Sequence, residues 1–129
     1  MSKLNKKLLI GSLVILGLAI LIGGISYSRS QPAPLDEFAQ CIKDSGAIFY
    51  GAFWCPHCQN QKTMFGRSER LLPYAECSLP SGRGQTQNCI DEGIESYPTW
   101  QYPDGTRESG KISLTRLAEK TGCTLPANY

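Results

Sequence analysis

The sequence predicts a small α/β domain that follows one N-terminal transmembrane helix. Three observations support this prediction. Residues 8–25 form an uncharged, apolar run. After this run, helix-like and strand-like patterns continue to the end of the chain, and two cysteines stand where an expected strand meets an expected helix. A chain of 129 residues has room for one domain of ordinary size with a buried core, but not for two.

The apolar run, LLIGSLVILGLAILIGGI, has about the length that a helix needs to cross the hydrocarbon core of a membrane. Lysines precede it, and basic residues stay on the cytoplasmic side. We therefore expect a cytoplasmic basic tail at residues 1–7, a signal-anchor helix at residues 8–25, and an extracytoplasmic remainder in a periplasm, a lumen or the cell exterior. A cleaved signal peptide is the alternative, because Ser26-Tyr27-Ser28 offers small residues, but the length of the run favours the anchor. A buried core helix is disfavoured because the run has no polar face.

Charge and cysteine content agree with export. Three of the thirteen Lys and Arg residues are N-terminal lysines, which leaves ten against eleven Asp and Glu in the exported part. The sequence contains no basic stripe and no basic motif with interleaved aromatic residues, so we expect no nucleic-acid partner. All six cysteines follow the apolar run, and an even number of cysteines in a small exported domain indicates disulfide bonds.

The first elements of the domain follow from spacing and from helix breakers. Residues 26–34 are polar and contain proline, which predicts a linker, so the domain should occupy residues 35–129. Apolar residues at helical spacing predict a helix over residues 35–44, which Gly46 ends. Residues 47–53 (AIFYGAF) predict a central strand that is covered on both faces.

The second helix is expected to begin at the cysteine pair and to run to Leu72, where Pro73 stops it, with Gly66 as a candidate kink. The remaining elements, in chain order, are a short strand at 74–77, a short helix near 86–92, a hairpin of strands at 98–102 and 107–111, and a last helix from the N-cap Ser113 to Lys120, with Gly122 just past its end. The expected order is therefore helix, strand, helix, strand, helix, hairpin, helix.

The motif Trp54-Cys55-Pro56-His57-Cys58 has the residues that thiol-disulfide exchange requires. Exchange needs one accessible cysteine with a lowered pKa and a second cysteine close enough to resolve the mixed disulfide. At a helix start, unpaired N–H groups and the helix dipole would face Cys55, and Cys58 would lie beneath it on the same face. Pro56 suits the first helical turn, and a charged His57 would favour the thiolate. Cys55, Cys58, His57 and Pro56 are our candidate catalytic residues.

Two other interpretations of the Cys-x-x-Cys pair are weaker. A structural zinc site has four ligands, and the sequence has no second Cys-x-x-Cys and no other histidine, so we expect no metal site. A copper or zinc carrier is kept as the alternative from another functional class. A purely structural Cys55–Cys58 disulfide would close so short a loop that it would stabilise the domain little. Nothing in the sequence points to a cofactor.

The order of these motifs resembles the thioredoxin superfamily over residues 35–123. An apolar strand leads into Trp-Cys-x-x-Cys, Tyr97-Pro98-Thr99 follows about forty residues later, and a hairpin and a helix come last. The resemblance implies a thioredoxin-like fold, in which helices flank a central mixed sheet. It also implies that Pro98 is a cis-proline facing the cysteine pair and that Tyr97 offers its backbone to a bound substrate strand.

Several stretches are similar to the thioredoxin-like domain that is fused to, or paired with, bacterial homologues of vitamin K epoxide reductase: FAQCIKDSGAIFYGAFWCPHCQNQKTMFG, YAECS, GQTQNCIDEGIESYPTW and LAEKTGC. This resemblance implies that the domain oxidises cysteine pairs of exported proteins and that a quinone-linked membrane enzyme reoxidises it. That partner would be a separate chain, because this sequence has no multi-helix membrane domain. A disulfide reductase or isomerase would use the same residues, since redox poise and partner set the direction.

Two features depart from the thioredoxin pattern. Thioredoxins begin with a strand, which residues 26–34 do not provide. Many family members also place a buried Asp or Glu six residues before the first cysteine, where this chain has Phe49. Deprotonation of Cys58 would then depend on water, on His57 or on a partner, and we expect mixed disulfides to be resolved slowly.

The other four cysteines, Cys41, Cys77, Cys89 and Cys123, allow three pairings. Cys77 ends an expected strand and Cys89 lies on the next expected helix, with a Gly-rich loop between them. We therefore pair these two, which leaves Cys41 with Cys123. The shorter loop would stabilise a small core by roughly 3 kcal/mol. The alternative is that Cys77 and Cys89 form a second redox pair, which relays electrons between a partner and the active site.

Four aromatic residues near the motif are candidates for an apolar collar around the cysteines: Phe53, Trp54, Tyr97 and Trp100. For Phe53 and Trp100, ordinary strand packing is the favoured interpretation. Trp54, next to the expected nucleophile, is the expected surface contact. Together with Tyr97 and Pro98, it completes the expected substrate-binding residues.

Overall fold

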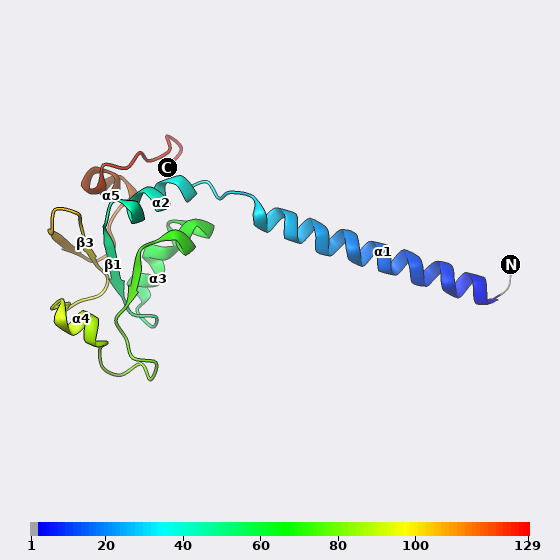
Figure 1. The fold of residues 1–129 in the computed structure, drawn as a ribbon, viewed down its shortest axis with the longest axis horizontal. Helices are drawn as coiled ribbons and strands as arrows, with labels where there is room; N and C mark the ends of the chain where they lie inside the picture. The colour runs from blue at the N-terminus through cyan, green and yellow to red at the C-terminus, as the bar shows by residue number, and fades with distance from the viewer. Residues whose placement is uncertain (1–2) are drawn as a thin grey trace. The chain divides into compact units, whose positions relative to one another are not determined.

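The computed structural model describes residues 3–129. Contacts within the chain define two compact units, one that ends at Pro32 and one from Ala33 to Tyr129, and each is described by itself. The first unit holds a single helix, and the second holds the sheet and the other helices (Figure 1).

Helix α1 spans Lys3–Ser30, and every side chain described between Lys6 and Ser28 is exposed. The segment Lys6–Ser28 is long and apolar enough to cross a membrane, by a criterion of length and composition that signal sequences also meet. The helix continues to Ser30, so the first part of the expected linker at residues 26–34 is helical. The reason is that neither glycine nor proline occurs between Ser26 and Gln31, whereas the ring of Pro32 disfavours helical backbone at the residue before it.

A four-stranded sheet with the strand order β2-β1-β3-β4 forms the centre of the second unit. The strands are β1 (Ile48–Gly51), β2 (Tyr74–Glu76), β3 (Thr99–Gln101) and β4 (Arg107–Ser109). β1 pairs with β2 in parallel and with β3 antiparallel, and β3 and β4 form the expected hairpin. The sheet is therefore mixed, as predicted. Within residues 3–129, β1 is the first strand, so the unit begins with a helix.

Helices flank this sheet. They are α2 (Asp36–Asp44), α3 (Pro56–Thr63), the 3-10 helix η1 (Gly66–Leu71), α4 (Gln87–Asp91) and α5 (Leu114–Thr121). The prediction of one continuous helix from the cysteine pair to Leu72 is wrong, because α3 ends at Thr63 and η1 follows it. Gly66 explains the break, since its φ of +53° lies in the left-handed region that other residues rarely adopt.

Side chains of β1 alternate between the two faces of the sheet. Phe49 points into the larger core, to which α2, α3 and α5 contribute, and stacks on Trp100 with ring centroids 4.8 Å apart. Tyr50 belongs to a second cluster, where it packs with Cys77 and Cys89. Burial on both faces explains why the sequence of the central strand is a continuous apolar run.

The last helix has the two caps that its sequence predicts. The side chain of Ser113 accepts a hydrogen bond from the backbone N–H of Arg116 at 3.1 Å. At the other end, Gly122 adopts the left-handed conformation, with a φ of +72°. Both ends of α5 are therefore fixed by local sequence.

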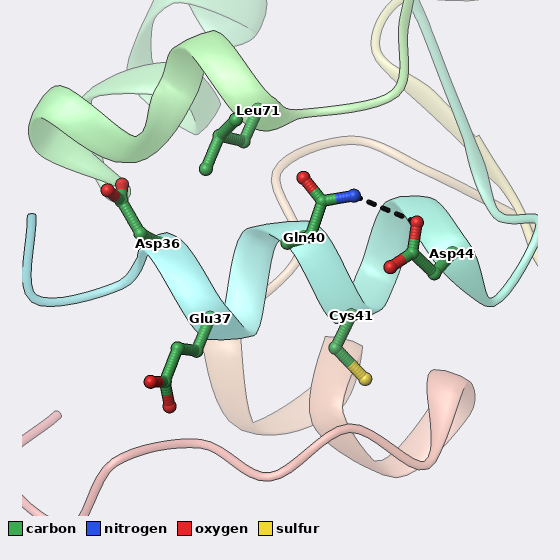
Figure 2. Close-up of a pocket in the computed structure, with 6 residues that line it drawn as sticks. All are labelled: Asp36, Glu37, Gln40, Cys41, Asp44 and Leu71. Atoms are coloured by element: carbon green, nitrogen blue, oxygen red, sulfur yellow. Dashed lines mark hydrogen bonds between the residues drawn. The ribbon is translucent and has the colours of Figure 1, made fainter. Parts of the chain in front are cut away.

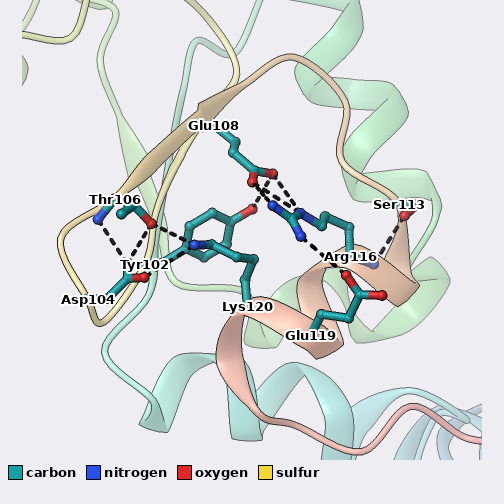
Figure 3. Close-up of polar contacts among 8 residues, drawn as sticks. All are labelled: Tyr102, Asp104, Thr106, Glu108, Ser113, Arg116, Glu119 and Lys120. Carbon is teal, nitrogen blue, oxygen red and sulfur yellow. Dashed lines mark hydrogen bonds and ion pairs between the residues drawn. The ribbon is translucent and has the colours of Figure 1, made fainter.

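Charged side chains of α5 reach the β3–β4 hairpin, as Figure 3 shows. Arg116 pairs with Glu108 at 2.6 Å, and Lys120 pairs with Asp104 at 3.2 Å. The hydroxyl of Tyr102, whose ring is buried, donates to Glu108 at 3.1 Å. These contacts hold the helix against the hairpin.

Candidate active site

Helix α3 begins at the cysteine motif. Cys55 is its N-cap residue, with extended backbone (φ −78°, ψ 118°), and Pro56 is its first residue. The carbonyl of Cys55 accepts the N–H of Gln59 at 3.1 Å, so the first turn closes directly after the cap. Because Pro56 has a fixed φ and no N–H, it suits this first position. The Cys55 thiol therefore lies at the positive end of the helix dipole.

The two thiols differ in access. Both are free, but Cys55 is 5% exposed and Cys58 is completely buried. Burial raises the pKa of Cys58 to about 12, the hydrogen bond with Cys55 acts in the same direction, and the charge of Lys62 acts in the opposite one. Of the two thiols, Cys55 therefore keeps a small solvent access, whereas Cys58 is placed to react with Cys55.

The Tyr97–Pro98 segment faces the cysteine pair. Its peptide bond is cis, and Pro98 is buried. The carbonyl of Tyr97 lies 3.7 Å from the Cys55 sulfur, within reach of an S–H···O bond. The phenol oxygen of Tyr97 accepts a hydrogen bond from Gln85 Nε2 at 2.8 Å. The sequence offered no signal for Gln85, because its role depends on a loop contact and not on a local pattern.

Trp54 and Phe53 form an exposed aromatic surface beside the pair. Trp54 is 52% exposed, and its indole N–H donates to the hydroxyl of Ser78 at 2.8 Å. Phe53 is 48% exposed, so the interpretation of Phe53 as strand packing is wrong; β1 ends at Gly51, before Phe53 is reached. Trp100 is completely buried, and its interpretation as strand packing is correct. Trp100 is therefore not part of an exposed aromatic collar around the cysteines.

His57 and Pro56 lie on the exposed side of α3. Cys58, the next residue, is buried, and adjacent residues of a helix do not face one another. His57 is therefore poorly placed to accept a proton from Cys58. His57 lies two residues after Cys55, in the first turn of the helix.

The site beneath the cysteines is apolar at Phe49. This side chain is fully buried between Trp100, on which it stacks, and Tyr74, which it meets edge to face at 5.2 Å. Two residues along β1, Gly51 lies under Cys58, because a Cβ at Gly51 would be only 2.9 Å from the Cys58 sulfur. The polar side chains near the buried thiol are instead Tyr74 of β2 and Lys62 in the last turn of α3.

The other four cysteines form two disulfides, Cys41–Cys123 and Cys77–Cys89. Cys77 and Cys89 are fully buried and pack with Tyr50, so a thiolate in solvent cannot reach them unless the domain opens. Their burial favours a structural role over a second redox pair. Cys41–Cys123 ties α2 to the segment that follows α5.

A groove on α2 shares no residue with the cysteine motif (Figure 2). It is lined by Asp36, Glu37, Gln40, Cys41, Asp44 and Leu71. Its cysteine is bonded to Cys123, so it offers no free thiol. Asp36 pairs with Arg70, and Asp44 accepts a hydrogen bond from Gln40 at 2.8 Å. The groove therefore contributes nothing to redox chemistry.

The arrangement is suited to disulfide exchange. Cys55 lies at a helix start and keeps a small exposed fraction, Cys58 lies buried beneath it, and the Tyr97 carbonyl beside them can accept a hydrogen bond from an extended chain. In the part of the chain that the structure describes, no group of three or more His, Cys, Asp or Glu side chains is placed to hold a metal ion.

Comparison with known proteins gave two informative relatives. The chain is 44% identical over 102 residues to Thiol-disulfide oxidoreductase LTO1 of Arabidopsis thaliana, which covers 76% of this chain and 27% of that protein. It is 33% identical over 96 residues to Thioredoxin domain-containing protein 5 homolog of Drosophila melanogaster, which covers 64% of this chain and 22% of that protein. The chain thus spans about a quarter of the length of these curated relatives. No family model matches the sequence.

The mixed sheet, its flanking helices and these relatives agree on the fold, which is thioredoxin-like. The printed names of the two relatives support the thioredoxin superfamily. Since one fold hosts many functions, the function of this chain depends on what its cysteine pair does.

Proposed function

We propose that this chain is a thiol-disulfide oxidoreductase that is anchored in a membrane by residues 8–25 and oxidises cysteine pairs of exported proteins. A separate quinone-linked membrane enzyme of the vitamin K epoxide reductase family would reoxidise it. The observation that carries the proposal is the position of Cys55, a thiol at the start of α3 with Cys58 buried beneath it and the Tyr97 carbonyl 3.7 Å away. The name of the Arabidopsis relative, a thiol-disulfide oxidoreductase, supports the same chemistry.

The proposed oxidation consists of two exchanges at Cys55. A substrate thiolate attacks the Cys55 sulfur of the oxidised pair, the Cys55–Cys58 bond breaks, and Cys58 leaves as a thiolate. A second substrate thiolate attacks the mixed disulfide, the substrate disulfide forms, and Cys55 leaves as a thiolate. The substrate loses two electrons and the pair gains them. A disulfide of the membrane partner accepts these electrons when it restores the Cys55–Cys58 bond.

The neighbouring residues support these exchanges in different ways. Pro56 starts the helix at whose positive end the Cys55 sulfur lies, and His57 is exposed in the first turn of the same helix. The exposed Trp54 offers an apolar contact, and Tyr97 with the cis-linked Pro98 presents a carbonyl to an extended substrate.

The reduction potential of the Cys55–Cys58 pair tests the direction of electron flow. An oxidase requires a potential near that of DsbA, about −120 mV, whereas a value near that of thioredoxin, about −270 mV, would mean that the pair is a reductant. Equilibration of the full chain in detergent with glutathione buffers, followed by alkylation and mass spectrometry, measures the potential. A value at the thioredoxin end would overturn the oxidase proposal and leave disulfide reductase or isomerase activity.

Trapping identifies the substrates. In a Cys58→Ala variant, the mixed disulfide on Cys55 cannot be resolved from within the chain, so exported proteins should remain bound through Cys55. A Cys55→Ala, Cys58→Ala double variant is the matched control and should trap none. Recovery of no exported protein with the single variant would contradict exchange in either direction.

A further inference from the structure

The buried thiol of Cys58 borders the ring of Tyr74 across the missing side chain of Gly51. A Cβ on Gly51 would lie 2.9 Å from the Cys58 sulfur and 2.9 Å from Cε2 of Tyr74. The sulfur and the ring atom are therefore separated by no more than twice that distance. Cε2 is bonded to the ring carbon that carries the hydroxyl, so the edge of the ring next to the hydroxyl borders the space at Gly51 that the Cys58 sulfur also borders.

The Tyr74 hydroxyl donates a hydrogen bond to Glu76. Both residues lie on the same face of β2, because they are two residues apart in a strand, and Glu76 is in register with Gly51. The Tyr74 hydroxyl lies 2.8 Å from Oε2 of Glu76. The other oxygen, Oε1, accepts the backbone N–H groups of Ser78 at 2.8 Å and Phe53 at 3.2 Å. Both oxygens of this side chain therefore accept hydrogen bonds.

Lys62 places a positive charge over the ring of Tyr74. It follows Cys58 by four residues and so lies one turn further along the same face of α3. Its Nζ is 3.5 Å from the centroid of the Tyr74 ring. The charge of Lys62 favours the Cys58 thiolate and lowers the pKa of this thiol, against the larger effect of burial.

The groups around Cys58 come from α3 and β2. From α3 they are Cys55 and Lys62, and from β2 Tyr74 borders the thiol across Gly51 and donates its hydroxyl to Glu76. Phe49 and Gly51 of β1 and Trp100 of β3 carry no titratable group. On β2, Glu76 is in register with Gly51, so a carboxyl group stands beside the strand position that lies under Cys58.

We propose that Glu76 is the proton acceptor for Cys58 when a mixed disulfide on Cys55 is resolved, and that the Tyr74 hydroxyl relays the proton. This inference rests on the proposed exchange function.

The thiol proton of Cys58 passes to the Tyr74 oxygen while the Tyr74 hydroxyl proton passes to Glu76. The Cys58 thiolate then attacks the Cys55 sulfur, the Cys55–Cys58 bond forms, and the partner sulfur leaves as a thiolate. The pair is oxidised by two electrons and the partner is reduced by two. Lys62 is a positioning residue that stabilises the thiolate.

The test separates the two steps of exchange in the reduced full chain in detergent. Ellman's reagent, an aromatic disulfide, reacts first with Cys55 and releases one thionitrobenzoate; the attack of Cys58 on the mixed disulfide then releases a second. In the Glu76→Gln variant, the amide oxygen still accepts the N–H groups of Ser78 and Phe53, but the side chain can no longer take a proton. We expect the first phase to be unchanged, and the second to be slowed about tenfold or more at pH 7, with its pH midpoint moved upward.

The Tyr74→Phe variant removes the relay and keeps the ring under Lys62. It should show the same selective slowing, and the Tyr74→Phe, Glu76→Gln double variant should be no slower than the slower single variant. Glu37→Gln, which removes an equal charge from the exposed face of α2, is the matched control and should leave both phases unchanged.

Two outcomes overturn the inference. One is a second phase with the wild-type rate and pH midpoint in either single variant, and the other is equal slowing of both phases. If circular dichroism shows that the Glu76→Gln chain is unfolded, Tyr74→Phe alone decides. Failure of the wild-type chain to give a second phase would instead contradict the proposed exchange function, so the two failures are distinguishable.

Discussion

The buried position of Cys58 predicts that its thiol is protected in the folded domain. In a Cys55→Ser variant, we expect iodoacetamide to modify Cys58 at pH 8 at least about a hundredfold more slowly than in the same chain unfolded in urea, because burial raises its pKa to about 12. Mass spectrometry of timed samples gives both rates. The Cys58→Ser variant, which keeps Cys55 at the helix start, is the control and should react faster than the Cys55→Ser variant. Equal rates for folded and unfolded Cys55→Ser chains would contradict the prediction.

Gly51 is required by close packing rather than by its backbone angles. A methyl group at Gly51 would meet the Cys58 sulfur and the Tyr74 ring at 2.9 Å, and overpacking of this kind costs about 1–3 kcal/mol. We therefore expect the Gly51→Ala variant to unfold at lower urea concentration than the wild type, by circular dichroism.

The matched control removes one of the two clashing groups. In a Gly51→Ala, Cys58→Ala double variant, the added methyl group occupies space that the sulfur has left. The double variant should therefore be destabilised by less than the sum of the two single variants. Additive effects would show that the contact at Gly51 does not limit packing.

The hydroxyl of Ser113 caps α5 and should contribute measurably to the stability of this element. Its bond to the Arg116 N–H is 3.1 Å long, and the loss of such a cap costs about 1 kcal/mol. We expect Ser113→Ala to lower the free energy of unfolding in urea by that amount. Thr115→Ala, on an exposed position of the same helix, is the control and should leave stability unchanged or slightly higher. Equal losses of unfolding free energy in both variants would show that the Ser113 cap does not stabilise the helix.

Elements with local signals could be predicted from the sequence. Ser113 and Gly122 mark the two ends of α5, and Cys55-Pro56 marks the start of α3. The break between α3 and η1 was missed because Gly66 predicted a kink, whereas its positive φ ends the helical path.

Contacts between elements could not be predicted in the same way. The exposure of Phe53 depends on where β1 stops, which no periodicity in AIFYGAF reveals. The approach of Tyr74 to Cys58 depends on the register of β1 with β2 and on the packing of α3 above them. The link from Gln85 to Tyr97 joins two loops that share no sequence pattern. The cysteine pair and its place at a helix start were thus visible in the sequence, but the residues that surround the pair were not.

Ion pairs and hydrogen bonds that join elements predict loss of stability in acid. Three carboxyl groups have a pKa below the usual value: Asp36, chiefly because of the hydrogen bond from Arg70; Asp104, at about 2, chiefly because of Thr106; and Glu108, chiefly because of Arg116. Since each folded pKa lies below the unfolded value of about 4, these groups stabilise the fold above pH 4, and the stabilisation is lost as the pH falls toward the folded values.

We therefore expect the urea midpoint of unfolding to be lower at pH 2.5 than at pH 5, as measured by circular dichroism. The Asp36→Asn variant removes the pair with Arg70, so its midpoint should be lower at pH 5 and should fall less steeply in acid. An Asp36→Asn variant with the full acid dependence of the wild type would contradict the role of this carboxylate.

At the scale of the whole molecule, the proposed export would explain why the chain combines disulfides with a free cysteine pair. Two disulfides, Cys41–Cys123 and Cys77–Cys89, support a small domain, and they persist only where the compartment is oxidising. The proposed anchor would keep Cys55 near a membrane partner, because every domain on such a helix stays close to the bilayer surface. The proposed oxidation by Cys55 and Cys58 therefore depends on the proposed membrane topology.

The orientation of the chain can be tested with cysteines placed at its two ends. In a background without Cys55 and Cys58, we expect a membrane-impermeant maleimide to label an Asn128→Cys variant in intact cells, and an Asn5→Cys variant only after the cells are opened. The lysines before the apolar run are the physical reason, since they resist transfer across the membrane. The parent without added cysteines is the control and should take up no label. Labelling of Asn5→Cys in intact cells would reverse the proposed topology and would place the cysteine pair in the cytoplasm, where the proposed oxidation of exported proteins could not occur.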